Sequence, residues 1–469
     1  MRVIVGSNIK VYNPSSELWD YVASNLIIAN PEYAKKVRMG FWVSNTSKDL
    51  HLYERQGDCL ILPFGVLRDI LPLIQTATIE RDFTERQTVN YNSIITLRDY
   101  QQEAVDSMVA KRYGILRSPA GSGKTQIGIA IIAKLGLKAL WLTHTLDLLH
   151  QSKERAEMYM STDMIGVISE GNVDIGQGVT FATVQTMSKL DLQQYRNCWD
   201  VVVVDECHRC SGTPTAITQF YKVLNNLAAR YKYGLSATVH RADGTIKATY
   251  ALLGQVVYTV PDEAVAKTVM RVGICPQYTS IKLSRDCLNT DGTLNYSKLI
   301  TYLCEDKTRT EQIALAIAKN AKHPALILSE RLNHLSSLMN ALPLELQAQA
   351  VMISGKMTSK SGKAEREKAI EDMRQGKKKY LFATYSLAKE GLDIPCLERL
   401  YLTTPQKDYA VVTQSIGRIA RVCEGKQDPI CYDFIDDAGY TVKMFKKRCT
   451  TYRKNGCYFM EAENECSNL

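Results

Sequence analysis

The chain has 469 residues, of which 45% are hydrophobic and 23% are charged, a composition typical of a globular protein with more than one hydrophobic core. The 58 Lys and Arg against 49 Asp and Glu give a net charge of +9, which fits a polyanionic partner without proving one. No apolar run reaches the ~20 residues of a membrane-spanning helix, and the N-terminus lacks the apolar stretch of a signal peptide, so a cytoplasmic location is expected.

The first part of the chain, residues 1–90, predicts a small α+β module. Short strands are expected at 3–5 and 9–12, followed by a helix over 17–27 and further strands at 50–53 and 60–62. The polar stretch 80–92 shows no apolar periodicity and is expected to be a linker.

Strands alternate with helices from 91 to 262 and again from 263 to 445, a pattern typical of parallel sheets with crossover helices. A C-terminal tail is expected over 446–469. Within the second α/β part, residues 281–296 contain the turn-forming Asn-Thr-Asp-Gly and predict a hairpin that could separate strands. The expected fold class is therefore α/β, with two tandem parallel-sheet domains and a small N-terminal α+β domain.

A glycine-rich segment at 118–125 lies between an apolar run and a helix-like run. Glycines let backbone N–H groups close around a phosphate at a helix N-terminus, a lysine reaches the β and γ phosphates, and a threonine binds Mg²⁺. The segment consists of Ser118, Pro119, Ala120, Gly121, Ser122, Gly123, Lys124 and Thr125. Its first residue is Ser where the usual pattern has Gly, which a loop that needs only a small side chain tolerates.

Two carboxylates, Asp205 and Glu206, follow four consecutive valines and are expected at the C-terminal end of a buried strand. Asp205 can hold Mg²⁺, and Glu206 can act as general base on the attacking water. Such a pair is often only a solvated strand end, but a phosphate loop in the same domain favours catalysis. The neighbouring Cys207 and Cys210 form a CxxC pair without a second pair at zinc-finger spacing, so no zinc site is expected.

The segment Asp-Glu-Cys-His at 205–208 resembles the DExH box of superfamily 2 helicases, and Ser-Ala-Thr at 236–238 resembles their coupling motif. Leu-Arg-Asp-Tyr-Gln at 97–101 resembles a segment of the XPB-like group, which implies that Gln101, next to Arg98, reads the adenine edge. The resemblance implies two RecA-like domains, ATP and Mg²⁺ as cofactors, and a nucleotide-binding role for His208. Arg-Ala-Asp at 241–243 departs from the Arg-Glu-Asp of that group, so no role is carried over to it.

The segment 414–421, Gln-Ser-Ile-Gly-Arg-Ile-Ala-Arg, matches the QxxGRxxR motif of the superfamily. The match implies that Gln414 contacts the nucleotide and that Arg418 and Arg421 reach the γ-phosphate. Planar guanidinium groups neutralise charge on the transferred phosphoryl group. The alternative is a helix with two arginines on a solvated face.

Other short segments resemble the nucleic-acid motifs of the superfamily. In the fifth motif, Thr384 would contact phosphate, Gly391 would allow close backbone approach, and Asp393 would approach the ribose. Hydroxyl and amide groups suit phosphate contacts that carry no sequence information. In the first α/β domain the corresponding candidates are Thr145, Thr183, Gln185 and Thr186.

The stretch 30–53 resembles the N-terminal domain of phage UvsW-like helicases, which act on branched DNA. Lys35, Lys36 and Arg38 stand near Trp42, and basic residues with aromatic neighbours suit backbone gripping and base stacking. Alternatively, Phe41 and Trp42 could form the core of this small domain. Because the module has no ATP-site residue, its removal is expected to spare hydrolysis.

Taken with the resemblance, these features predict an ATP-dependent DNA helicase or translocase that remodels duplex, forked or branched DNA with 3′-to-5′ polarity. It is expected to act as a monomer on DNA, in the bacterial host cytoplasm if phage-encoded, beside recombination or replication proteins. An RNA helicase, the motor of a restriction system and an ATP-switched nucleic-acid clamp that does not translocate are the alternatives.

Overall fold

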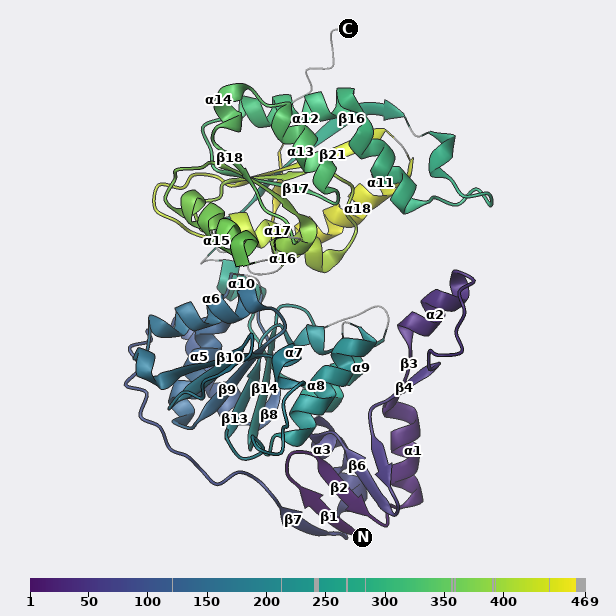
Figure 1. The fold of residues 1–469 in the computed structure, drawn as a ribbon, viewed down its shortest axis with the longest axis vertical. Coiled ribbons are helices and arrows are strands. Elements are labelled where there is room, and N and C mark those ends of the chain that lie inside the picture. The colour runs from purple at the N-terminus through teal and green to yellow at the C-terminus, as the bar shows by residue number, and fades with distance from the viewer. Residues whose placement is uncertain are drawn as a thin grey trace. The chain divides into compact units, whose positions relative to one another are not determined.

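The computed structural model describes residues 1–460 except 120, 212, 240–243, 267–268, 283, 356, 358–359, 390–391, 393 and 438. The chain divides into two compact units, Met1–Pro261 and Asp262–Leu469 (Figure 1). Over the described range, every helix is too short or too polar to cross a lipid bilayer.

The N-terminal part of the first unit is built on a five-stranded sheet with the order β5-β6-β2-β1-β7. Val3, Val5, Ile9 and Val11 are buried, while Ile4 in β1 and Lys10 in β2 are only partly buried. This alternation is the period of a sheet with one covered face. The elements are β1 (Arg2–Val5), β2 (Ile9–Tyr12), α1 (Ser16–Asn25), β3 (Ile27–Ala29), α2 (Pro31–Arg38), β4 (Asp49–His51), β5 (Glu54–Gln56), β6 (Cys59–Leu62), η1 (Phe64–Val66), α3 (Leu67–Ile70), η2 (Leu71–Ile74) and β7 (Thr78–Arg81).

An eight-stranded sheet with the order β11-β10-β12-β9-β13-β14-β8-β15 forms the rest of the first unit. All its strand pairs are parallel except β10 with β11. Its elements are α4 (Asp99–Val109), β8 (Tyr113–Arg117), α5 (Lys124–Leu135), β9 (Ala139–Thr143), α6 (Leu146–Glu157), η3 (Thr162–Met164), β10 (Ile165–Ser169), β11 (Asn172–Val173), β12 (Val179–Thr183), α7 (Val184–Met187), β13 (Val201–Val204), η4 (Cys207–Ser211), α8 (Pro214–Asn226), β14 (Tyr231–Ser236), α9 (Ile246–Leu253) and β15 (Val256–Thr259).

The two parts of the first unit share one hydrophobic core. Side chains of the N-terminal sheet and of η1 pack in the same cluster as Tyr113, Ile217, Ala248 and Ala251 of the eight-stranded part. A Cβ atom on Gly65 would lie 2.5 Å from the carbonyl oxygen of Tyr250, so only glycine allows η1 to approach α9 this closely. The N-terminal module is therefore packed against the parallel-sheet part rather than tethered to it.

The polar stretch after β7 has no strand or helix from 82 to 98 except an isolated bridge at Thr88, but it is held along the eight-stranded part. The backbone N–H of Thr84 donates to the carbonyl of Ala228 at 3.0 Å. The N–H of Gln87 donates to the Asp200 carboxylate at 2.8 Å, and the buried Tyr91 donates its hydroxyl to a backbone carbonyl. The sequence predicted a linker, and the structure shows that most of this connection is docked.

The second unit contains a seven-stranded sheet with the order β18-β19-β17-β20-β21-β16-β22, in which every pair is parallel. Its elements are α10 (Asp262–Ala266), β16 (Gly273–Lys282), η5 (Arg285–Cys287), α11 (Tyr296–Glu305), α12 (Lys307–Lys319), β17 (Ala325–Ser329), α13 (Leu332–Asn340), α14 (Leu344–Gln347), β18 (Ala350–Met352), α15 (Lys360–Arg374), β19 (Tyr380–Thr384), α16 (Tyr385–Lys389), β20 (Arg399–Leu402), α17 (Tyr409–Ile419), β21 (Ile430–Asp437), α18 (Gly439–Lys454) and β22 (Tyr458–Phe459).

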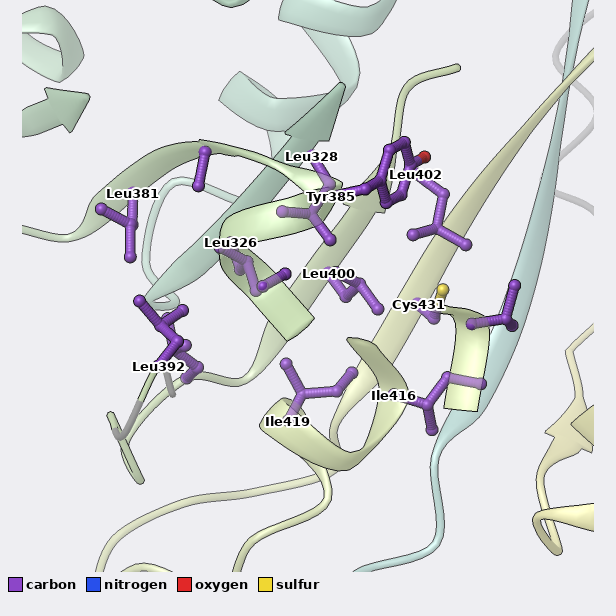
Figure 2. Packing of buried hydrophobic residues seen from close by; sticks show 14 of the residues in the cluster. Leu326, Leu328, Leu381, Tyr385, Leu392, Leu400, Leu402, Ile416, Ile419 and Cys431 are labelled. Carbon is purple, nitrogen blue, oxygen red and sulfur yellow. The ribbon is translucent and has the colours of Figure 1, made fainter. Parts of the chain in front are cut away.

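Both faces of this second sheet are buried, which explains why its strands read as continuous apolar runs. Leu326 and Leu328 of β17 belong to the core on one face, and Ile327 belongs to the core on the other. Figure 2 shows the first of these cores, where Ile416 and Ile419 of α17 face strand side chains such as Leu400, with Leu326, Leu328, Leu381, Tyr385, Leu392, Leu402 and Cys431 also labelled. This packing positions α17 and the segment after β19.

The fold class predicted from the sequence is confirmed: two RecA-like α/β domains with parallel sheets and a small N-terminal α+β region. The hairpin predicted for 281–296 is formed only in part. The backbone N–H of Asn289 donates to the carbonyl of Thr293 at 2.7 Å, so the chain turns back there, but the predicted flanking strands do not pair along their length in the described residues. Leu288 and Leu294 form only an isolated bridge, Tyr296 already begins α11, and Leu283 lies outside the described residues. The start of the expected C-terminal tail, at 446, falls inside α18, whose Arg448 is buried against Asp433.

Candidate functional site

The glycine-rich segment forms a loop between β8 and α5, as its sequence predicted. Gly121 and Gly123 have φ angles of +82° and +79°, in the left-handed region that favours glycine. Ser118 is fully buried, and its Oγ lies 2.5 Å from Ser122 Oγ, which closes the loop on itself. Lys124 is the first residue of α5, so the unsatisfied N–H groups of this helix face the loop, an arrangement that binds phosphate. The carbonyl of Pro119 accepts from Ser122, and Ala120 lies outside the described residues.

Two side chains of α4 brace this loop from the outside. The Tyr100 hydroxyl and the Gln101 Nε2 both donate to the Ser122 carbonyl, at 3.0 and 2.8 Å. Gln101 Oε1 accepts from the backbone N–H of Arg98 at 3.0 Å, so both ends of this amide are engaged. A Cβ atom on Gly123 would lie 2.6 Å from Gln101 Nε2, so glycine is needed there. Recognition of the adenine edge by Gln101 stays a prediction. The contact of Tyr100 with the loop was not predicted from the sequence.

The carboxylates Asp205 and Glu206 stand directly after β13, the position predicted from the four valines. Glu206 has a φ angle of +47°, a strained conformation that turns the chain at the strand end. Its Oε1 lies 3.7 Å from Lys124 Nζ, which joins the DExH segment to the phosphate loop. Ser152 of α6 donates to Asp205 Oδ2 at 3.4 Å. Sequence reasoning missed Ser152, because no local pattern relates α6 to β13.

The two carboxylates have opposite pKa shifts. Burial raises the pKa of Asp205 above its usual value, and the neighbouring Glu206 adds to this rise. Burial also tends to raise the pKa of Glu206, but Lys124 and His208 outweigh it, so the net pKa lies below its usual value. Glu206 is therefore ionised at neutral pH, as a general base must be.

The residues at this strand end fit a divalent cation. Oε2 of Glu206 is buried, and Nδ1 of His208 lies 3.2 Å from it. Lys124 places one positive charge within 4 Å of Glu206. The pair has two carboxylates, so a second positive charge is needed to balance Asp205. Asp205 and the Thr125 hydroxyl at the start of α5 provide the hard oxygen ligands that Mg²⁺ prefers. Mg²⁺ held there would neutralise phosphate charge.

Ser236, at the end of β14, links the two halves of this site. β14 lies between β13 and β8 in the sheet. The Ser236 carbonyl accepts from the N–H of Ser118 at 2.9 Å, while its Oγ lies 3.0 Å from Nδ1 of His208. The same Nδ1 lies 3.2 Å from Oε2 of Glu206. The phosphate loop and the DExH segment are therefore connected through one side chain.

Hydroxyl and amide candidates for strand contact gather at the ends of β9 and β12, two adjacent strands. Oγ1 of Thr145 caps α6, and Oγ1 of Thr183 caps α7 by accepting from the N–H of Thr186 at 3.3 Å. Nε2 of Gln185 donates to the His144 carbonyl at 2.9 Å and ties the two loops together. Burial lowers the pKa of His144 to about 4, with Arg209 and His208 acting in the same direction, so this imidazole is neutral.

The arginine motif of the second unit lies on α17 and just beyond it. Nε and Nη1 of Arg418 donate to the carbonyls of Ala388 and Leu392, at 2.9 and 2.8 Å. Arg418 is therefore bonded to the end of α16 and to Leu392 within its own unit. Arg421 follows the end of α17, and its carbonyl accepts from Lys426 Nζ at 2.8 Å.

Two further candidates of the second unit are described, and two are not. Oγ1 of Thr384, at the end of β19, lies 2.9 Å from Oγ of Ser386 in an exposed position. Oε1 of Gln414 on α17 is buried without a hydrogen-bond partner in the described part of the chain. Gly391 and Asp393, like Arg241 to Asp243 of the first unit, lie outside the described residues.

The basic and aromatic residues of the N-terminal module are on the surface. No residue of α2, which carries Lys35, Lys36 and Arg38, is buried. The side chain of Trp42 is 82% exposed and that of Phe41 is 61% exposed. The alternative that these aromatic residues form the core of the module is therefore wrong.

Two helicase family profiles match the two α/β domains. Residues 94–241 match the type III restriction enzyme res subunit, and residues 307–423 match the helicase conserved C-terminal domain. Probable helicase D10 of Escherichia phage T5 is 24% identical over 466 residues, covering 97% of this chain and 95% of that protein. DNA 3′-5′ translocase XPB2 of Sulfurisphaera tokodaii is 26% identical over 361 residues, covering 71% and 79%. The crystal structure of T4 UvsW aligns over 98% of this chain and 99% of that chain, with 18% identity and a TM-score of 0.41.

The RecA-like pair, the phosphate loop and the DExH segment define a nucleic-acid helicase. The predicted family is confirmed, and the chain belongs to the superfamily 2 helicases that include XPB and phage helicases.

Proposed function

We propose that this protein is an ATP-dependent DNA helicase or translocase that unwinds or remodels forked and branched DNA in the 3′-to-5′ direction. The observation that carries the proposal is the exposed, basic and aromatic α2 region in the same unit as the phosphate loop and the DExH segment. The relative named as a DNA 3′-5′ translocase supports both the DNA substrate and the direction.

Hydrolysis in this proposal depends on a small set of side chains. Lys124 binds the β and γ phosphates, and Asp205 with Thr125 holds Mg²⁺. Glu206, ionised at neutral pH, takes the proton of the attacking water. Arg418 and Arg421 are the candidates that stabilise charge on the transferred phosphoryl group, and Arg418 also donates to carbonyls of its own unit.

Strand contact in this proposal is independent of base sequence. Thr145, Thr183, Gln185 and Thr186 offer hydroxyl and amide groups at adjacent strand ends, and Thr384 offers a hydroxyl in the second unit. Groups of this kind bind phosphate oxygens, which are alike along the strand. A motor that tracks phosphates can move along any sequence.

The setting is inferred from the phage relative. We infer a monomer acting on DNA in the cytoplasm of a bacterial host, in recombination or replication, where branched intermediates arise.

One pair of measurements tests the proposal. ATP hydrolysis is measured with single-stranded DNA or RNA as activator, and strand separation is measured on forked and linear duplexes. We expect DNA to be the better activator and the fork to be separated faster, with Lys124→Ala as the inactive control. Stronger activation by RNA would establish an RNA helicase, and ATP-dependent binding without strand separation would establish a clamp.

A further inference from the structure

Residues 27–51 form an arm on the N-terminal sheet: the β3–β4 ribbon, α2 and the connecting loop. Figure 1 shows α2 beyond the ribbon, away from α1. The arm is braced internally through Asn30, which is only 5% exposed. Its side chain caps α2 by accepting from the N–H of Glu32 at 3.0 Å and donates to the Ser47 carbonyl at 2.8 Å. Nζ of Lys36 donates to Thr46 Oγ1 at 2.7 Å, so residues at both ends of α2 hold the end of the loop.

Large apolar side chains point outward from this braced arm. Val37 and Met39 are 54% and 53% exposed, and the neighbouring Phe41 and Trp42 are more exposed still. Gly40 has a φ angle of +68°, which ends α2 and turns the chain. The loop is held by hydrogen bonds while its apolar side chains remain in water. The folded structure of the arm therefore keeps these side chains exposed. A cluster of this kind marks a binding surface.

The charge of the arm indicates the chemistry of its partner. Between 30 and 51 there are four basic residues, Lys35, Lys36, Arg38 and Lys48, and two acidic ones, Glu32 and Asp49, giving 4 − 2 = +2. Lys36 is paired with Glu32 at 2.9 Å. Flat aromatic rings among basic side chains suit a ligand with exposed π-faces and a negatively charged backbone. Unpaired nucleic acid has both properties.

We propose that the tip of this arm binds a base that is unpaired at the branch point of a nucleic acid, with Trp42 as the stacking surface and Phe41 beside it. Lys35 and Arg38 contact the flanking phosphates. The proposal rests on the proposed function, because it requires a forked substrate. It assigns to the arm the recognition of the junction itself, which a phosphate-tracking motor does not provide.

The fluorescence of Trp42 gives a direct test. The chain has four tryptophans, of which Trp141 and Trp199 are 0% and 1% exposed, and Trp19 is partly buried. Subtracting the signal of Trp42→Phe isolates Trp42. We expect a fork with unpaired arms to quench this difference signal, and a blunt duplex of the same length to leave it unchanged. Absence of quenching by the fork would overturn the proposal.

Fork affinity provides the second readout. Trp42→Ala should weaken fork binding ~10-fold, the effect of removing one stacked base, with little change in salt dependence. Trp42→Phe should retain most of the affinity. Lys35→Ala with Arg38→Ala should instead lower the slope of log K against log salt, by ~0.7 to 0.9 for each phosphate that the variant no longer neutralises. Leu344→Ala, which removes an apolar side chain that is 81% exposed in the second unit, is the matched control and should change nothing.

The two proposals fail in different ways. If the wild-type protein hydrolyses ATP and separates forks, but Trp42→Ala binds forks as tightly as the wild type, only the arm proposal is wrong. If the wild-type protein shows no nucleic-acid-stimulated hydrolysis, the proposed function is wrong. Quenching of Trp42 by a protein partner but not by the fork would make the arm a protein-docking surface and would also overturn the proposal.

Discussion

Nδ1 of His208 lies 3.0 Å from Oγ of Ser236, and this contact connects the DExH segment to the strand end that also holds the phosphate loop. The carbonyl of Ser236 binds the N–H of Ser118 at the same time. A displacement of either motif should therefore move the other. The residues that bridge the site come from three separate strand ends, which only the parallel order β13-β14-β8 brings together.

Changing Ser236 to Ala should affect the coupling of hydrolysis to strand separation more than hydrolysis itself. The variant loses the hydroxyl contact with His208 and two contacts with the backbone of Thr238, but keeps the backbone contact with Ser118, so the loop stays in place. We expect hydrolysis within a few-fold of the wild type and strand separation lowered at least ~10-fold, because the loss of one hydrogen bond alone has about that effect. The measurement is the number of ATP molecules hydrolysed per base pair separated. An unchanged ratio would show that this contact is only structural.

Changing Glu206 to Gln should trap a nucleotide-bound protein. The amide keeps the size of the carboxylate but cannot accept the proton, and general-base assistance contributes ~10²–10⁴-fold in rate. We expect kcat to fall by this order while ATP affinity changes little, measured by single-turnover hydrolysis and by equilibrium nucleotide binding. A collapse of nucleotide affinity would show instead that Glu206 supports the loop through Lys124.

Substitution of the two arginines of the α17 motif should have different effects on kcat and on the melting temperature. Arg421→Ala should lower kcat far more than it raises KM. An arginine that contacts the transferred phosphoryl group stabilises the transition state and contributes ~10³–10⁵ in rate. Arg418→Ala removes the donor of two carbonyls and should lower the melting temperature of the protein as well. Thermal unfolding and steady-state kinetics of both variants, side by side, make the distinction. Equal melting temperatures together with equal kcat losses would contradict it.

Removing residues 1–81 should destabilise the rest of the first unit, although the sequence alone predicts that the module can be removed freely. The deletion would uncover Tyr113, Ile217, Ala248 and Ala251, which share the core of the module. We expect a lower melting temperature and aggregation of the truncated protein, and therefore loss of hydrolysis. The triple variant of Lys35, Lys36 and Arg38 to Ala is the control, since these exposed side chains leave the core intact. A truncated protein that stays in solution with full hydrolysis would show that the module is independent of the motor.

Lys232 should make the stability of the first unit depend on pH. Its Nζ donates to the carbonyls of Ser7 and Leu224, at 2.6 and 2.7 Å, and burial together with the nearby Arg196 lowers its pKa to about 7. Because the unfolded pKa is ~10.4, the folded state releases the proton first, so the free energy of unfolding should rise as pH increases from 7 towards 10. The slope is on the order of 1 kcal/mol per pH unit.

Denaturant unfolding at pH 7 and pH 9 measures this effect, with Lys232→Met as the comparison. The variant keeps an unbranched side chain and has no proton to release, so its stability should vary less with pH. The same pH slope in both proteins would exclude Lys232 as the cause.

Local sequence determined those parts of the protein whose residues are close together along the chain. The loop over 118–125 needs left-handed glycines at fixed positions before a helix, and Asp205 with Glu206 needs only the buried strand before it. Both are patterns of a few residues, and both were found where they were predicted. The apolar runs of the central strands likewise predicted parallel sheets, because strands covered on both faces require them.

Tertiary structure decided every feature that depends on which faces meet. Tyr100, Ser152 and Ser236 reach the site from elements with no common sequence pattern. Whether Trp42 was core or surface depended on whether any element covers the arm, and no side chain of the described residues buries it. A period of two or 3.6 residues identifies the apolar face of a strand or a helix, but packing between distant elements selects its partner, and the chain order does not encode that choice locally.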